Sequence, residues 1–158
     1  MPNISHPELI IAIALTVILT MTIISFRILG RRWKAVEKAV DMILPESMPA
    51  EGVEIPLVEA ASGLKALAPV TFAHTNIGPK LILYENRFDY KVFFKRSALY
   101  SDIESLRVYR SRFFNRLTFK FFNSNLFVTF ALPDEHILGR IVQFLSAKGV
   151  YPDEKSRL

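Results

Sequence analysis

The sequence predicts an α+β protein in which one N-terminal transmembrane helix is followed by an antiparallel β-rich domain and a C-terminal amphipathic helix. Three observations predict this class. Residues 9–26 are eighteen residues without a charge, residues 69–131 contain short runs of β-forming residues, and residues 133–148 change to a helical period. Hydrophobic residues make up 51% of the chain, and the excess over a soluble protein is concentrated at its N-terminal end.

The apolar segment is long enough to cross a bilayer. Eighteen helical residues span about 27 Å, close to a hydrocarbon core of about 30 Å. Its threonines can bond to carbonyl oxygens one turn earlier, so they need no other partner. The preceding residues contain no Lys or Arg, and no A-x-A cleavage pattern follows. We therefore expect residues 1–30 to be a retained anchor and not a cleaved signal peptide.

Charge around this segment predicts its orientation. Basic residues cluster after the apolar run and none precedes it, which places the N-terminus outside and the C-terminal domain in the cytoplasm. The expected site is the cell's inner (cytoplasmic) membrane, which the chain crosses once. The residues expected at the membrane interface are Arg27, Arg31, Arg32, Trp33 and Lys34.

Two segments are expected between the anchor and the domain. Residues 31–44 have an amphipathic helical pattern, typical of a helix on the headgroups, of an extension that packs on a partner, or of a stalk against its own domain. Residues 45–68 contain prolines and glutamates and no basic residue before Lys65, which predicts an acidic linker. Within that linker, residues 57–68 suit either a short helix broken near Gly63 or a first strand followed by a turn.

The β-rich domain is expected over residues 69–148, with about six to seven strands. Short turns between the strands favour antiparallel meanders, because parallel strands need long crossovers. Pro133 and Asp134 are typical of a helix start, and Gly149 of a helix end. Residues 149–158 are expected to be a frayed tail. The expected strands are Val70–His74, Leu81–Tyr84, Phe88–Lys95, Leu106–Arg110, Arg116–Phe122 and Leu126–Ala131.

The order of these elements resembles bacterial pleckstrin-homology-like domains. The likeness is carried by KLILYENRFDYKVFF, at residues 80–94, and by Leu99-Tyr100-Ser101-Asp102-Ile103 with Leu106 and Val108. It implies a barrel or sandwich closed by one C-terminal helix, and a binding or scaffolding module more than an enzyme. Because Ile103 and Leu106 are three residues apart, both can face inward only if a turn or bulge follows Asp102.

One basic and aromatic segment is the candidate surface for a partner or for lipid, and its residues are Arg110, Arg112, Phe113, Phe114 and Arg116. Such a segment suits a loop that inserts into a membrane, a protein contact or a nucleic-acid contact. It equally suits a connection between strands whose phenylalanines belong to the core.

The sequence offers little for catalysis. It has no cysteine, its three histidines lie far apart, and it contains no P-loop, HExxH, GxGxxG or nucleophile-elbow motif. We therefore expect no enzyme activity, catalytic residue, cofactor or metal. The expected function is a membrane-anchored interaction or scaffold module, an accessory component of a membrane protein complex; the alternative is a peripheral sensor of anionic lipid. The expected partners are the bilayer and another membrane protein and not nucleic acid, and a homo-oligomer is compatible with the sequence.

Overall fold

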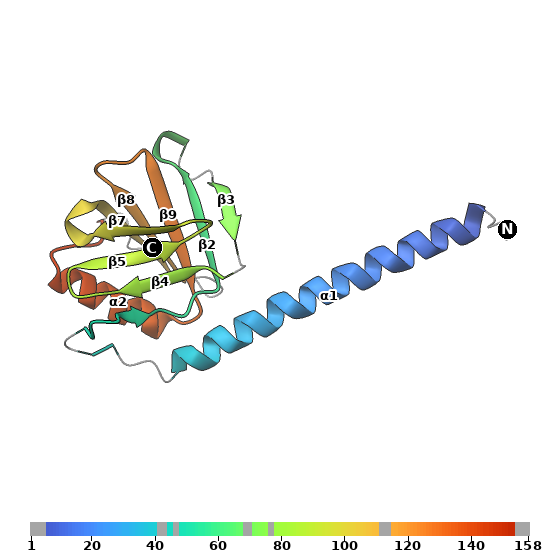
Figure 1. Ribbon diagram of the computed structural model, residues 1–158, viewed down its shortest axis with the longest axis horizontal. Helices are drawn as coiled ribbons and strands as arrows, with labels where there is room; N and C mark the ends of the chain where they lie inside the picture. Colours follow the sequence, from blue (N-terminus) through green and yellow to red (C-terminus); the bar gives the residue numbers. More distant parts are fainter. Residues whose placement is uncertain are drawn as a thin grey trace.

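The structure, a computed structural model, describes residues 6–40, 44–45, 48–67, 71–75, 78–110 and 115–153. It contains a long apolar helix followed by a sandwich of two antiparallel sheets and a C-terminal helix (Figure 1). The elements are helix α1 (His6–Val40), strands β1 (Val53–Glu54), β2 (Glu59–Leu64), β3 (Thr71–Thr75), β4 (Lys80–Leu83), β5 (Arg87–Lys91), β6 (Lys95–Leu99), β7 (Ile103–Arg110), β8 (Asn115–Phe121) and β9 (Leu126–Leu132), 3₁₀ helices η1 (Lys65–Leu67) and η2 (Tyr100–Asp102), and helix α2 (Glu135–Ala147).

The predicted α+β class agrees with this architecture. One sheet has the strand order β1-β4-β5-β6, the other β3-β2-β9-β8-β7, and the two are not closed into a barrel. The described residues therefore hold nine strands, against the six to seven expected. The arrangement is compatible with a pleckstrin-homology-like outline.

Aromatic rings fill the space between the sheets. Phe88, which is fully buried, has its ring centroid 5.2 Å from that of Phe119 and 5.7 Å from that of Tyr100. Helix α2 covers this core with the apolar stripe expected from the sequence; its buried residues are Ile137, Leu138, Ile141 and Leu145. Asp134 caps the helix by accepting a hydrogen bond from the His136 backbone N–H at 3.0 Å.

The expected irregularity after Asp102 is confirmed. The pairing of β7 with β8 shifts register between Ile103 and Ser105, and both Ile103 and Leu106 are buried as a result. The Asp102 carboxylate fixes the preceding turn by accepting a hydrogen bond from the Leu99 backbone N–H at 3.0 Å.

The linker expected over residues 45–68 differs from the structure. Met48 and Ile55 are buried in the core, β1 pairs with β4, and β2 pairs with both β3 and β9. The reading of residues 57–68 as a first strand followed by a turn agrees with β2 and η1. The sandwich thus begins well before residue 69, because this segment supplies buried core side chains and two of the paired strands.

The strand expected at Phe88–Lys95 is wrong: this segment folds into a hairpin. Strands β5 and β6 pair antiparallel up to Lys91 and Lys95, and residues 92–94 make the turn, here called the hairpin tip. A side-chain bond holds the two strands in register, since the Ser97 hydroxyl donates to the Asp89 carboxylate. The alternation of apolar residues continues through the turn, so it does not reveal the break.

The tail expected to fray from residue 149 is held in place as far as Asp153. Pro152 lies beside Leu106, the Asp153 backbone N–H donates to the Leu106 carbonyl at 2.8 Å, and Arg107 forms an ion pair with Asp153 at 3.2 Å. The tail therefore lines the free edge of β7. Residues 154–158 lie outside the described residues.

Candidate binding site

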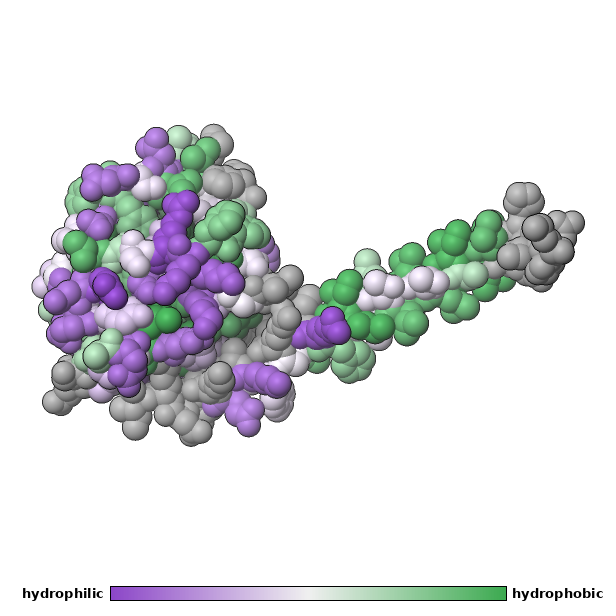
Figure 2. Space-filling model, in the orientation of Figure 1, coloured by the Kyte–Doolittle hydropathy of each residue, from purple (hydrophilic) through white to green (hydrophobic). Residues whose placement is uncertain are grey.

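Helix α1 is continuous from His6 to Val40, across the boundary expected at residue 30. Its segment Leu9–Arg27 is apolar enough to cross a membrane and is nowhere buried. The face of this helix seen in Figure 2 is mostly apolar, with a few weakly polar residues along it. Thr16 and Thr20 donate to carbonyl oxygens one turn earlier at 2.8 and 2.7 Å, as expected. By length and composition this helix is either a membrane anchor or a signal sequence.

Three of the expected interface residues can be placed. Arg27, Trp33 and Lys34 are exposed on α1, and 75% of Trp33 is accessible. Arg31 and Arg32 lie on the same helix, but their side chains are outside the described part of the structure.

The basic and aromatic segment near residue 113 is only partly described. Arg112, Phe113 and Phe114 lie outside the described residues. Arg110 and Arg116 do not share a face, because Arg110 is paired with Asn115 and Arg116 with Tyr109 across the β7–β8 hairpin.

Both arginines have acidic neighbours in the fold. Arg110 lies 3.7 Å from Glu135 at the start of α2, and Arg116 lies 3.3 Å from Glu59 on β2. The sequence therefore overestimates how far these two side chains form one surface.

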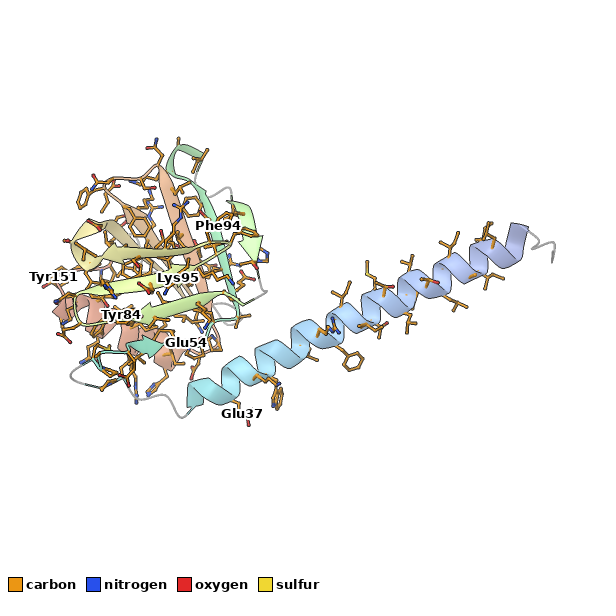
Figure 3. All side chains as sticks on the ribbon, viewed as in Figure 1. Glu37, Glu54, Tyr84, Phe94, Lys95 and Tyr151 are labelled. Atoms are coloured by element: carbon orange, nitrogen blue, oxygen red, sulfur yellow. The ribbon has the colours of Figure 1, made fainter. Side chains whose placement is uncertain are left out.

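A more concentrated apolar surface lies at the hairpin tip, which sequence reasoning missed. Val92 is buried, whereas 53% of Phe93 and 77% of Phe94 are exposed. Lys91, Lys95 and Arg96 flank the tip, where Figure 3 labels Phe94 and Lys95. The sequence does contain a signal for this surface, since Phe93 and Phe94 have basic neighbours just as the Phe-Phe pair at residues 113–114 does. It is missed because the strand expected at Phe88–Lys95 includes the tip.

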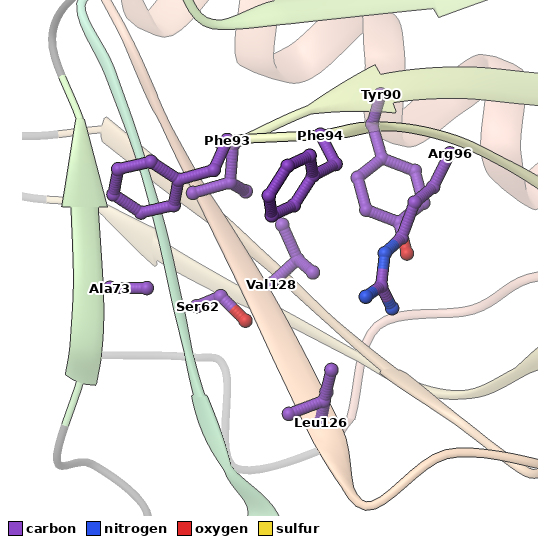
Figure 4. A pocket seen from close by; sticks show the side chains of 9 residues that line it. Ser62, Ala73, Tyr90, Phe93, Phe94, Arg96, Leu126 and Val128 are labelled. Carbon is purple, nitrogen blue, oxygen red and sulfur yellow. The ribbon is translucent and has the colours of Figure 1, made fainter.

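An open cavity of about 210 Å³ lies beneath the tip. The inner faces of β2, β3 and β9 form its floor through Ser62, Ala73 and Val128, and Phe93, Phe94 and Arg96 form its rim (Figure 4). We call this cavity the open slot. Its lining is mainly apolar and offers water few hydrogen-bond partners. The open slot therefore favours an apolar group.

Two leucines extend the apolar floor of the open slot. Leu64 pairs with Leu126 at one end of β2 and β9, and by strand alternation both face the inside of the sandwich with Ala60 and Val128. Yet 38% of Leu64 remains exposed, and Leu126 is only half-buried. The four-stranded sheet therefore leaves part of the inner face of the five-stranded sheet uncovered.

The rim carries a polar pair. In Figure 4 the Arg96 guanidinium lies beside the Tyr90 hydroxyl. Burial raises the pKa of the Tyr90 phenol, and the neighbouring Arg96 charge offsets part of that increase. Tyr90 is therefore a neutral hydrogen-bonding group at neutral pH, next to a permanent positive charge.

The outer side of the hairpin holds a buried carboxylate. Only 5% of Asp89 is exposed; it lies 3.1 Å from Lys95 and accepts a 3.4 Å bond from the Tyr84 hydroxyl. The hydrogen bond from Ser97 is the main reason why the pKa of Asp89 is lowered, and it outweighs the opposing effect of burial. Asp89 is thus charged and fully engaged in joining β5 to β6, so it stabilises the hairpin that carries the tip.

Among the described residues, no group of three His, Asp or Glu side chains lies close enough to hold a metal ion. The fold and site define the class of this protein as an α+β chain with one apolar N-terminal helix and an antiparallel β-sandwich open at one end. Comparison with protein-family models and with curated proteins found no significant match.

Proposed function

We propose that the protein is a single-pass, membrane-anchored interaction or scaffold module without enzyme activity. Its domain is of the pleckstrin-homology-like type, lies on the cytoplasmic side of a bacterial inner membrane and binds another membrane protein as an accessory component of a complex. Nucleic acid is not a partner in this proposal. The observation that carries it is a fully exposed apolar helix joined to a sandwich whose open end displays Phe93 and Phe94.

The physical basis is effective concentration. Anchoring confines the domain to a thin layer at the bilayer, so a contact that is weak in solution suffices to hold a membrane-bound partner. Exposed aromatic side chains with arginine nearby are typical of the centres of protein interfaces. The hairpin tip therefore suits a contact surface better than the two separated arginines at 110 and 116.

The alternative function is a sensor of anionic lipid. The tip favours it as well, because exposed phenylalanines with flanking lysines suit the headgroup region of an anionic leaflet. Lipid composition separates the two functions: contact with lipid phosphates through basic residues requires an anionic leaflet, whereas contact with a protein partner persists in neutral lipid.

Purification of the full-length protein from gently solubilised membranes tests the proposal. We expect a defined membrane protein to co-purify with the wild type and to be lost when Phe93 and Phe94 are both changed to serine. The matched control is Phe122→Ser, because Phe122 is 65% exposed on a different turn, and this variant should retain the partner. The proposal fails if the wild type brings down no defined partner, or if the double variant retains it.

A further inference from the structure

We propose that the open end of the sandwich binds an extended, apolar and acidic segment of a partner protein. This segment adds to β6 as a further antiparallel or parallel strand and places one apolar side chain in the open slot. The inference rests on the proposed function and names the chemistry of the partner.

The first argument is that β6 has a free edge. Among the strands that the structure describes, it is the terminal one of its sheet and pairs only with β5. The Leu99 backbone N–H points away from β5, since it donates to the Asp102 carboxylate. Because this orientation alternates along an antiparallel strand, the backbone groups of Ser97 and Lys95 also point outward.

No backbone hydrogen bond joins these outward groups to another segment in the part of the chain that the structure describes. The corresponding edge of the other sheet differs, because the tail at Pro152 and Asp153 lies along β7. Strand β6 is therefore a template for one more strand.

The second argument is the size and lining of the open slot. Its volume of about 210 Å³ is somewhat larger than that of an apolar cavity of about 150 Å³, which is large enough to bind benzene. It thus fits one leucine- or phenylalanine-sized side chain. A strand added at β6 would extend the four-stranded sheet over Leu64 and Leu126, the part of the inner face that is still exposed.

The third argument is charge. Arg96 lies on the rim of the open slot, and Lys91 and Lys95 flank the hairpin tip next to it. The only acidic side chain of this hairpin, Asp89, is already bonded to Lys95 and Ser97 on its outer side. This excess of positive charge favours an acidic segment. It also disfavours a second copy of this chain, because two β6 strands side by side would bring their basic side chains together.

The experiment uses the full-length protein in nanodiscs of neutral lipid. The probe is a short fluorescein-labelled peptide of alternating valine and glutamate, and binding is followed by fluorescence anisotropy. Two further probes carry N-methyl groups on alternate residues, one in each frame. A last probe has lysine in place of glutamate.

We expect the valine–glutamate peptide to bind and the lysine peptide not to bind. Each N-methylated peptide has the N–H groups of one edge blocked, and only one edge of an added strand pairs with β6. One of the two peptides should therefore lose at least about tenfold in affinity, equal to about 1.4 kcal/mol, and the other should bind as the unmethylated peptide does. Arg96→Glu and Phe94→Ser should each weaken binding by a similar factor. Lys120→Glu, on the outer face of β8, is the matched charge-reversal control and should bind as the wild type does.

Three outcomes would overturn the inference. The first is no binding of any peptide, and the second is equal loss or equal retention in the two N-methylated frames. The third is that the tip binds lipid instead. It is tested with a fluorophore on a cysteine introduced at position 94, because the chain has no other cysteine. In this outcome the fluorophore enters an apolar environment in anionic nanodiscs, leaves it when salt is added, and the peptides do not bind. None of these three outcomes changes the co-purification result, so the proposed function is tested independently of this inference.

Discussion

Replacing Phe88 by alanine is expected to remove a large part of the stability of the sandwich. Phe88 is fully buried, and its ring contacts those of Tyr90, Tyr100, Phe119 and Phe121. Truncating a buried phenylalanine typically costs about 3–5 kcal/mol, out of a total of about 5–15 kcal/mol for a native domain. Urea denaturation of the full-length protein in nanodiscs, followed by near-ultraviolet circular dichroism, measures the loss.

Phe122→Ala is the matched control for that change. The residue type and the substitution are the same, but Phe122 is 65% exposed on the turn between β8 and β9. We expect its free energy of unfolding to stay within about 0.5 kcal/mol of the wild type. Equal effects of the two substitutions would contradict the position of Phe88 at the centre of the core.

Gly52→Ala is expected to lower the free energy of unfolding by about 2–4 kcal/mol, measured in the same way. Gly52 has φ +76°, a left-handed conformation that costs an alanine about 1–2 kcal/mol. A Cβ atom there would also lie 2.7 Å from Ile82 Cγ2 and 2.9 Å from the Leu83 carbonyl oxygen. The backbone atom cannot rotate away, so the overlap adds a packing cost to the strain of the conformation.

Gly78→Ala separates these two causes. Gly78 also has positive φ, at +64°, but no atom of the described residues lies within 4 Å of the position of its Cβ. We expect this control to show only the conformational cost, about 1–2 kcal/mol. If Gly52→Ala were no worse than Gly78→Ala, residues near Gly52 would not pack against β4, and the sandwich would begin later than the structure places it.

The elements that could be predicted are those whose pattern is local. The stripe of Ile137, Leu138, Ile141 and Leu145 predicts α2 because one helical face must be buried. Strand β8 alternates strictly, with Leu117, Phe119 and Phe121 inward. The three-residue spacing of Ile103 and Leu106 even predicts the irregularity in β7, since only a register shift buries both.

The features that could not be predicted depend on distant partners. Strand β1 has two residues and exists because it pairs with β4, so its own sequence among prolines and glutamates reads as a linker. The hairpin tip is hidden because Tyr90, Val92 and Phe94 keep the alternation of a continuous strand. The open slot combines residues of β2, β3, β9 and the hairpin, which only the folded chain brings together.

The account depends most on residues 9–26 staying in the bilayer as part of the mature chain. The most direct measurement is the intact mass of the protein recovered from carbonate-washed membranes. We predict that the protein is found in the membrane fraction at the mass of the uncleaved chain. Recovery in the soluble wash, or a mass that lacks the apolar segment, would contradict the tethered module.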